Sequence, residues 1–287
     1  MKVLLTGASG FVGSHLLREL EQHGHVVTTV GRGAESDFDW SDEQLRAGVA
    51  AADGIIHLAG ENLFARRWSK KTKAVLRESR TVPTRRLAEL AVELKKSFLV
   101  TASAVGYYGP SDAERLTEDA PRGDDFVAKL CGDWEEATKV ARESSVRVST
   151  VRIGVVLGAD GGALKRMLLP FRLGLGGPVG NGKQPFPWIH IDDLTALFRF
   201  LVENDTASGI FNGTAPNSNS MGEFARALGK VLHRPALLPA PAFALRALLG
   251  EVSSILLTGQ RPVPQRALDA GFEFKHPSID AALSDLL

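Results

Sequence analysis

Short apolar runs separated by amphipathic stretches organise the first half of the chain. The runs at residues 2–7, 25–30, 54–58, 97–101 and 146–153 show little alternation, which is typical of strands buried on both faces of a parallel sheet. Between them, helical spacing covers residues 11–22, 41–49, 68–96 and 124–144, and the third of these stretches is expected to form two helical pieces that meet near Pro83. Strands that alternate with helices predict right-handed crossovers and an α/β fold with a doubly wound parallel sheet.

The pattern changes after Leu157. Residues 158–182 are rich in glycine around a helical core at 163–172, and later helices are predicted at 191–202, 221–232, 241–249 and 278–287, with a short strand at 209–212. We therefore expect a sheet domain at residues 1–157 and a smaller C-terminal α/β lobe at residues 158–287. Residues 186–215 are expected to return to the core of the sheet domain.

Composition narrows the function classes. The formal net charge of +1 removes any strong argument for nucleic acid or an anionic membrane as a partner. A single cysteine rules out a disulfide framework and favours a reducing, cytoplasmic compartment. No secretory signal is visible at the start, and prolines, Arg246 and Glu251 interrupt the apolar stretch 237–259, which argues against a membrane span. We expect a small-molecule partner, no nucleic acid and no membrane; the oligomeric state stays open, a homodimer included.

Three glycines, each three residues from the next, follow the first predicted strand: Gly7, Gly10 and Gly13. The first allows a tight turn, the second lets the backbone approach a pyrophosphate, and the third lets helix and strand pack closely. The N–H groups that open the following helix suit phosphates. Such a triplet alone also fits an ordinary turn, but between a strand and a helix it predicts a Rossmann-type dinucleotide site. The same turn supplies further predicted cofactor residues: Ser9, Phe11 and Val12.

The end of the second predicted strand distinguishes between two dinucleotides. It reads Val30-Gly31-Arg32-Gly33 and holds no carboxylate for a free ribose 2′-hydroxyl. The planar guanidinium of Arg32 suits a 2′-phosphate instead. One charge-assisted hydrogen bond contributes about 1.5–3 kcal/mol, which is about ten- to hundredfold in affinity. The sequence favours NADP(H) over NAD(H), with a solvated surface arginine as the alternative.

Four stretches resemble the extended short-chain dehydrogenase/reductases: TGASGFVG, IIHLAG, SAVGYYG and WIHIDDL. HLAGENLFARRW and LTGQRPVPQRALDAGFEFKHPSIDAAL are similar to the atypical subgroup called epimerase family proteins, and the resemblance covers nearly the whole chain. It implies an NADP(H)-binding Rossmann fold with a small C-terminal lobe and an undefined substrate. It also implies cofactor contacts from the backbone after the third strand and from two arginines, although His57 also fits a structural role and Arg80 a solvated helix face. These residues are His57, Leu58, Ala59, Gly60, Arg80 and Arg152.

The resemblance implies a catalytic set of a serine or threonine, a tyrosine, and a lysine four residues after the tyrosine. Ser103 matches the serine, and we expect it to orient a substrate oxygen and to contact the cofactor. On the next helix, Val127 and Cys131 stand where the tyrosine and lysine belong. A missing general acid or base costs about 10²–10⁴ in rate.

Tyr107 and Tyr108 are the only tyrosines, and they lie four and five residues after Ser103. One of them is a candidate for the missing acid; the alternative is that both pack against substrate or a lid. Cys131 is typical of a buried small hydrophobe, with a nucleophilic or redox role as the alternative.

The substrate side also departs from the resemblance. Sugar-nucleotide enzymes of this type carry an arginine that grips the diphosphate at the position of Phe186, so a nucleotide sugar is doubtful and a flatter, more apolar substrate is as plausible. His190 with Asp192 and Asp193 lacks the spacing of a zinc site, and we predict no metal. Predicted substrate contacts are Glu61, Asn62, Gln184, Trp188, His190 and Arg261.

We therefore predict an NADP(H)-binding, epimerase-like or oxidoreductase protein with an atypical active site. The alternative is an NADPH-sensing protein that binds the cofactor without turnover. The missing tyrosine and lysine favour the sensor, whereas the substrate lobe favours the enzyme.

Overall fold

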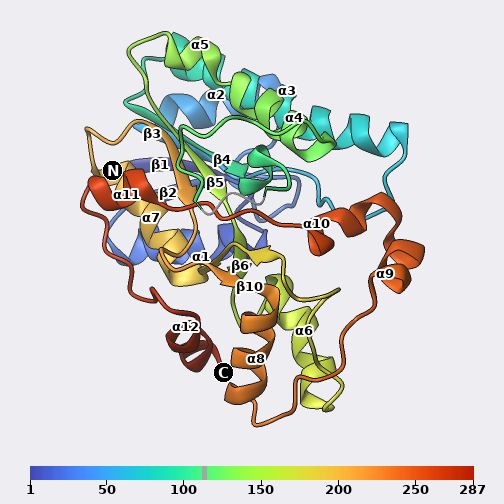
Figure 1. The fold of residues 1–287 in the computed structure, drawn as a ribbon. Coiled ribbons are helices and arrows are strands. Elements are labelled where there is room, and N and C mark those ends of the chain that lie inside the picture. The colour runs from blue at the N-terminus through green and yellow to red at the C-terminus, as the bar shows by residue number, and fades with distance from the viewer. Residues whose placement is uncertain (112–114) are drawn as a thin grey trace.

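A six-stranded parallel sheet forms the centre of the computed structural model, which describes residues 1–111 and 115–287. The strand order is β2-β1-β3-β4-β5-β9, with the crossover reversal between β1 and β3 that creates a ligand crevice at the carboxyl ends of the strands (Figure 1). The fold class predicted from the alternating pattern is confirmed. The strands are β1 (Lys2–Thr6), β2 (Val26–Val30), β3 (Gly54–His57), β4 (Phe98–Ala104), β5 (Arg147–Ile153) and β9 (Gly209–Gly213).

Helices cover both faces of the sheet (Figure 1). On one face, α1 (Phe11–Gln22) and α7 (Ile191–Glu203) pack together over a core that includes Leu16, Leu20 and Phe198. The other face carries α2 (Asp42–Ala51), α3 (Lys70–Glu93), α4 (Phe126–Glu136) and α5 (Lys139–Arg142). A short 3₁₀ helix, η1 (Val105–Tyr108), directly follows β4 and contacts α4.

A smaller group of elements lies below the carboxyl ends of the strands (Figure 1). Its two small sheets pair β6 with β8 in parallel and β7 with β10 in antiparallel orientation. They share a third apolar core with α6, α8 and α12. The strands are β6 (Val155–Leu157), β7 (Pro185–Phe186), β8 (Trp188–His190) and β10 (Asn219–Ser220). The helices are α6 (Gly162–Arg172), α8 (Met221–Val231), α9 (Ala242–Leu249), η2 (Gly250–Ser253), α10 (Ser254–Leu257) and α12 (Ile279–Leu286), while α11 (Gln265–Asp269) packs beside β9.

The division of residues 68–96 into two pieces at Pro83 is wrong. A single helix, α3, runs through Pro83, which lies inside its last three turns. A proline in a helix interior costs about 3 kcal/mol because it removes a hydrogen bond. The residues around it, Arg80, Thr84 and Leu87, are buried on one face, and this packing outweighs the local cost.

The single helix expected at residues 124–144 is also wrong. It breaks after α4, and Thr138 turns its hydroxyl back onto the carbonyl of Glu135 at 2.7 Å before α5 begins. Such local side-chain bonds compete with helix continuation. The small strands β6, β7, β8 and β10 were not predicted because two or three residues carry no readable period.

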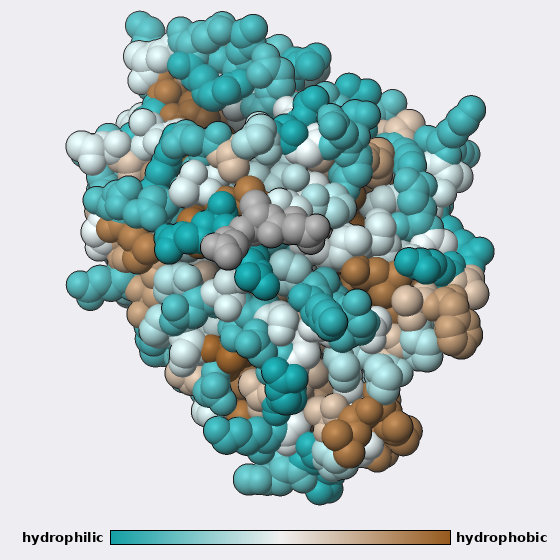
Figure 2. Space-filling model, viewed as in Figure 1, coloured by the Kyte–Doolittle hydropathy of each residue, from teal (hydrophilic) through white to brown (hydrophobic). Residues whose placement is uncertain are grey.

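Exposed apolar side chains gather on the smaller group of elements. Figure 2 shows brown surface over the lower end of α6 and beside α9 and α10. Phe243 and Leu248 of α9 and Leu169 of α6 are among the most exposed large apolar residues. None of the helices in the described ranges combines the length and apolarity needed to span a membrane.

Candidate functional site

The glycine turn joins β1 to α1 with almost no space between them. Gly7 has φ +79°, and a Cβ there would lie 2.9 Å from the backbone nitrogen of Ala59. A Cβ on Gly13 would overlap the carbonyl oxygen of Gly7. The turn therefore requires glycine at both positions and brings the backbone of Leu58 and Ala59, after β3, against the loop.

The start of α1 is left open to a ligand. Gly10 is its N-cap and supplies no side-chain hydrogen bond, and the first turn holds no acidic residue. By contrast, Asp125 caps α4 and Ser220 caps α8. Uncapped first-turn N–H groups and the positive end of the helix dipole form an anion site. The residues present at this turn fit a pyrophosphate, and Ser9 is exposed beside them.

Arg32 follows β2 at the same edge of the sheet. It is exposed and makes no hydrogen bond or ion pair with any residue in the described ranges. Its guanidinium is therefore available to a ligand. The nearest acidic neighbour along the chain is Glu35, whose carboxylate folds over Gly33.

His57 ends β3 and is fully buried. Its Nδ1 lies 2.6 Å from the hydroxyl oxygen of Thr6, and its Nε2 has no hydrogen-bond partner among the described residues. Burial lowers the pKa of His57 to about 3, so the ring is neutral at physiological pH. The structure places this imidazole inside the fold.

Arg80 lies in α3 and is only 8% exposed. Its guanidinium donates to the carbonyl oxygens of Leu76 at 3.0 Å and Glu61 at 2.8 Å, and it lies over the ring of Trp134. Arg80 also packs beside Gly60. It therefore fixes the backbone that follows β3, while the side chain of Asn62 accepts from the backbone N–H of Phe64 within the same loop.

Ser103 belongs to a buried hydrogen-bond network at the carboxyl ends of β4 and β5. Its hydroxyl donates to Oε1 of Glu135 at 2.7 Å. Arg152, on the neighbouring strand, donates to both carboxylate oxygens of Glu135 at 2.9 Å. Burial opposes the charged form of Arg152, but the hydrogen bonds and charge of Glu135 outweigh it, and the pKa of Arg152 is raised. The structure thus uses Arg152, a predicted cofactor contact, to hold Glu135.

The two tyrosines join this network differently. The hydroxyl of Tyr108 donates to Asn212 at 2.7 Å and accepts from Arg152 at 2.9 Å, and burial raises its pKa. The ring of Tyr107 stacks on the Arg152 guanidinium, whose central carbon lies 3.4 Å from the ring centre. Among the described residues, the Tyr107 hydroxyl has no hydrogen-bond partner.

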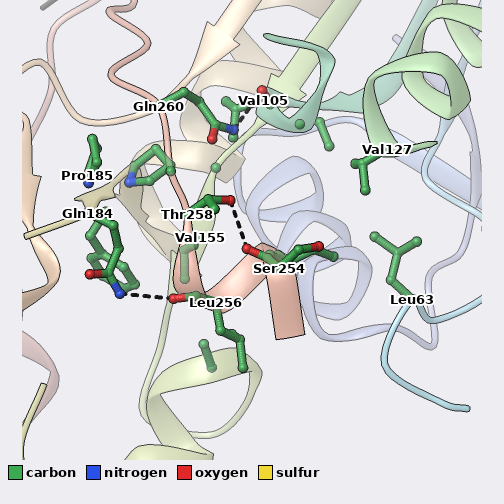
Figure 3. Close-up of a pocket in the computed structure, with 18 of the residues that line it drawn as sticks. Leu63, Val105, Val127, Val155, Gln184, Pro185, Ser254, Leu256, Thr258 and Gln260 are labelled. Carbon is green, nitrogen blue, oxygen red and sulfur yellow. Dashed lines mark hydrogen bonds between the residues drawn. The ribbon is translucent and has the colours of Figure 1, made fainter. Parts of the chain in front are cut away.

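A cavity of about 430 Å³ opens where β4 and β5 end. Figure 3 shows side chains from several elements facing it: Val127 from α4, Val155 from β6, and Ser254 and Leu256 from α10. Phe11, at the start of α1, also lines it, so the cavity adjoins the glycine turn. Val127 thus presents an apolar side chain where the resemblance places a tyrosine.

Cys131 lies one helical turn further along α4 and is buried. Burial, with a smaller contribution from the Glu135 charge, raises the pKa of its thiol to about 12. A thiol in this environment is not a nucleophile at neutral pH.

The predicted substrate residues divide between the cavity and the core. Gln184 lines the cavity, whereas Trp188 and His190 are buried in β8 and are not among its described lining residues. The indole of Trp188 donates to the side chain of Asn219 at 2.9 Å. Arg261 is partly buried next to the segment that closes the cavity.

Four side chains that include His190 converge at the start of α7: His190, Asp192, His276 and Asp285. Nδ1 of His190 accepts the backbone N–H of Asp192 at 3.1 Å. Nε2 of His190 lies 3.4 Å from the Asp285 carboxylate and, like Nε2 of His276, has no hydrogen-bond partner among the described residues. Asp192 also pairs with Lys275 at 3.3 Å. His190 thus caps the start of α7, and the absence of a metal stays a prediction.

Two features of the site were missed from the sequence. Residues 254–260 close the cavity, held by bonds from Gln260 to the carbonyl of Val105 at 2.8 Å and from Gln184 to the carbonyl of Leu256 at 3.0 Å (Figure 3). Asp125 is the second missed residue, at the cavity rim. An aspartate just before a helical pattern is a readable N-cap signal, whereas no sequence signal locates the closing segment.

Comparisons with known proteins agree with this architecture. The model of the NAD dependent epimerase/dehydratase family matches residues 3–212, and that of a domain of unknown function, DUF1731, matches residues 240–286. The epimerase family protein SDR39U1 of Mus musculus is 41% identical over 294 residues, covering 100% of both chains. The SDR39U1 homolog of Arabidopsis thaliana, described as chloroplastic, is 39% identical over 303 residues, covering 100% of this chain and 87% of its own.

A solved structure shows the same similarity. The crystal structure of human epimerase family protein SDR39U1 (isoform2) with NADPH matches with a TM-score of 0.93 and 39% identity, covering 100% of this chain and 99% of that one.

Proposed function

Because this chain belongs to the NAD dependent epimerase/dehydratase family, among its SDR39U1-like epimerase family proteins, we propose that it binds NADP(H) and converts a small molecule in an oxidoreductase or epimerase-like reaction. The observation that carries this proposal is the open start of α1, whose N-cap Gly10 supplies no side chain to the first-turn N–H groups. The human relative described with NADPH supports the choice of cofactor.

In this proposal the chain holds the cofactor at three places. First-turn N–H groups of α1, at Phe11 and Val12, receive the pyrophosphate, and Arg32 receives the 2′-phosphate. The backbone at 58–60 borders the ribose. When bound, the cofactor supplies or accepts a hydride at its nicotinamide.

The catalytic roles that we propose rest on the hydrogen bonds of single side chains. Ser103 would orient a substrate oxygen, using a hydroxyl whose proton already points to Glu135. Of the two tyrosines, Tyr107 is the better proton donor, since the Tyr108 hydroxyl is held by Arg152 and Asn212. Neither tyrosine is among the described cavity-lining residues, so this role requires Tyr107 to turn toward the cavity.

A protein that binds NADPH without turnover is the second candidate. The observation that favours it is the pair Val127 and Cys131, which puts an apolar side chain and a protonated thiol where a tyrosine and lysine would act.

The division into residues 1–157 and 158–287, and a cytoplasmic location, also remain proposals. The placement of β9 in the central sheet supports the return of residues 186–215 to the first domain. One buried cysteine supports a reducing compartment.

NADPH titration combined with a turnover assay tests the proposal. We expect saturable NADPH binding, and oxidation of NADPH in the presence of at least one member of a panel of small carbonyl compounds. Ser103→Ala should slow that oxidation by a larger factor than it weakens NADPH binding. Tight binding without turnover of any compound would instead establish the sensor, and absence of NADPH binding would refute both candidates.

A further inference from the structure

The wall of the cavity at the ends of β4 and β5 is almost entirely apolar. Side chains from more than six elements and loops form it, and its large members include Phe11, Leu63, Val127, Met167, Phe186 and Leu256. Phe186 is fixed in place by the ring of Phe224, 4.4 Å away between centroids. A ligand that fills this space exchanges water mainly for hydrocarbon, which favours apolar ligands in proportion to the area they bury.

Most hydrogen-bond donors of the polar side chains in the wall are used within the chain itself; the exception is one of the two amide hydrogens of Gln260. Gln184 donates to the carbonyls of Val179 and Leu256, and Gln260 donates to the carbonyl of Val105. The hydroxyls behave in the same way. Ser254 donates to the carbonyl of Glu251 at 2.8 Å. Thr258 donates to the carbonyl of Ser254, also at 2.8 Å (Figure 3). What these side chains still offer a ligand is therefore acceptor oxygen for an alcohol and the second amide hydrogen of Gln260 for a carbonyl.

The charges in the cavity lining also favour an uncharged ligand. Asp125 is the single charged residue among the described residues that line the cavity, and it is an anion. No lysine or arginine of the described lining can neutralise a phosphate there. Moving an unpaired charge into an apolar cavity costs several kcal/mol. This solvation cost disfavours a diphosphate in the cavity.

Asp125 does not convert the cavity into a site for cations. One of its oxygens accepts the backbone N–H of Ala128 at 2.7 Å as the cap of α4, and the residue is exposed at the rim, where water screens it.

We propose that the cavity binds an uncharged ligand with an apolar body and one alcohol or carbonyl group, and that it does not bind nucleotide sugars. This inference rests on the proposed function only in placing the reacting carbon near the ends of β4 and β5. The apolar wall, its acceptor oxygens and the second amide hydrogen of Gln260 carry the ligand class.

A homologous ligand series tests the proposal by direct binding, measured calorimetrically with and without saturating NADPH. The probes are the straight-chain ketones 2-pentanone, 2-heptanone and 2-nonanone. We expect affinity to rise about fourfold for each added methylene until the cavity is filled. Heptanoate and heptylammonium should bind at least tenfold more weakly than 2-heptanone, and UDP-glucose should not bind. A flat ketone series, or UDP-glucose binding as tightly as 2-heptanone, would overturn the proposal, as would tighter binding of heptylammonium.

Variants show whether the ketones bind in the cavity or on the exposed apolar surface. Val127→Asp places a charge in the wall and should weaken 2-heptanone at least tenfold without changing NADPH affinity. Ile255→Asp, in α10, makes the same test if the first variant folds poorly. Val82→Asp is the matched control because Val82 is 63% exposed on α3. Phe243→Ser removes an exposed aromatic ring on α9 and should leave ketone affinity unchanged. Ketone affinity that follows Phe243 instead of Val127 would overturn the proposal.

The two hypotheses fail separately in these measurements. If NADPH does not bind but the ketone series does, the proposed function fails and the ligand class stands. If NADPH binds and the ketones do not, the ligand class fails and the cofactor assignment stands.

Discussion

Arg152 and Glu135 form a buried, two-pronged ion pair directly beside Ser103. Both bonds measure 2.9 Å, and the serine hydroxyl donates to the same carboxylate at 2.7 Å. The Arg152 side chain is 3% exposed and that of Glu135 10% exposed. The pair connects β5 to α4, so it fixes the helix that supplies Val127 to the cavity wall.

We expect Glu135→Gln to lower the free energy of unfolding by about 3–5 kcal/mol, because it leaves the Arg152 charge buried without a counter-charge. Urea denaturation measures this. Glu136→Gln is the matched control: the neighbouring carboxylate is exposed and pairs with Arg142 at the surface, where such pairs are worth about 0–1 kcal/mol. Equal stability of the two variants would show that the buried pair has no structural role.

Gly10→Ala should impair NADPH binding alone, whereas Gly13→Ala should also impair stability. A Cβ on Gly10 meets only the carbonyl oxygen of Gly7 at 3.2 Å, so the fold should tolerate it while the methyl group obstructs the phosphates. We expect at least a tenfold loss of NADPH affinity with a melting temperature near that of the wild type. A Cβ on Gly13 overlaps the backbone of Gly7, and that variant should lose stability as well. Unchanged NADPH affinity in Gly10→Ala would contradict the pyrophosphate assignment.

The Cys131 thiol should be inert in the folded protein. Burial raises its pKa to about 12, so the reactive thiolate is scarce at neutral pH. We expect no labelling by a charged disulfide reagent in native buffer and complete labelling in denaturant, which a colorimetric thiol assay reads directly. Since Cys131 is the single cysteine, rapid native labelling would establish the nucleophilic or redox role that the burial argues against.

Acid should destabilise the protein through His57. Its pKa is about 3 when folded, against about 6.5 when unfolded, so the unfolded state binds the proton more readily. The resulting loss begins near pH 6.5, grows as the pH falls toward 3, and amounts to about 2 kcal/mol at pH 5. His57→Gln should show a smaller difference in unfolding free energy between pH 7.5 and pH 5, whatever its absolute stability. An identical difference in both proteins would mean that His57 is not buried as a neutral ring.

The sheet, its flanking helices and the glycine turn were predictable because each rests on a local signal. The apolar run of β1, the glycine spacing and the helical period of α1 are all readable within residues 2–22. Pro83 shows the limit of that approach: the local rule favours a break, and burial of the helix face across the proline overrides it.

The candidate site was predictable only in part. The positions of Ser103 and Arg32 follow from the ends of predicted strands. The partners of Ser103 do not, because Glu135 and Arg152 lie 32 and 49 residues away along the chain and meet only through the fold. The cavity is likewise closed by residues 254–260, whose place over β4 no local period reveals.

Calorimetric titration of NADPH and NADH into the wild type and Arg32→Ala tests the central claim most directly, with Arg85→Ala, an exposed arginine of α3, as the control. The account predicts that the wild type binds NADPH at least tenfold more tightly than NADH, and that Arg32→Ala loses this preference while its affinity for NADH stays the same. Arg85→Ala should behave as the wild type. No heat with either dinucleotide, or a preference that survives in Arg32→Ala, would contradict it.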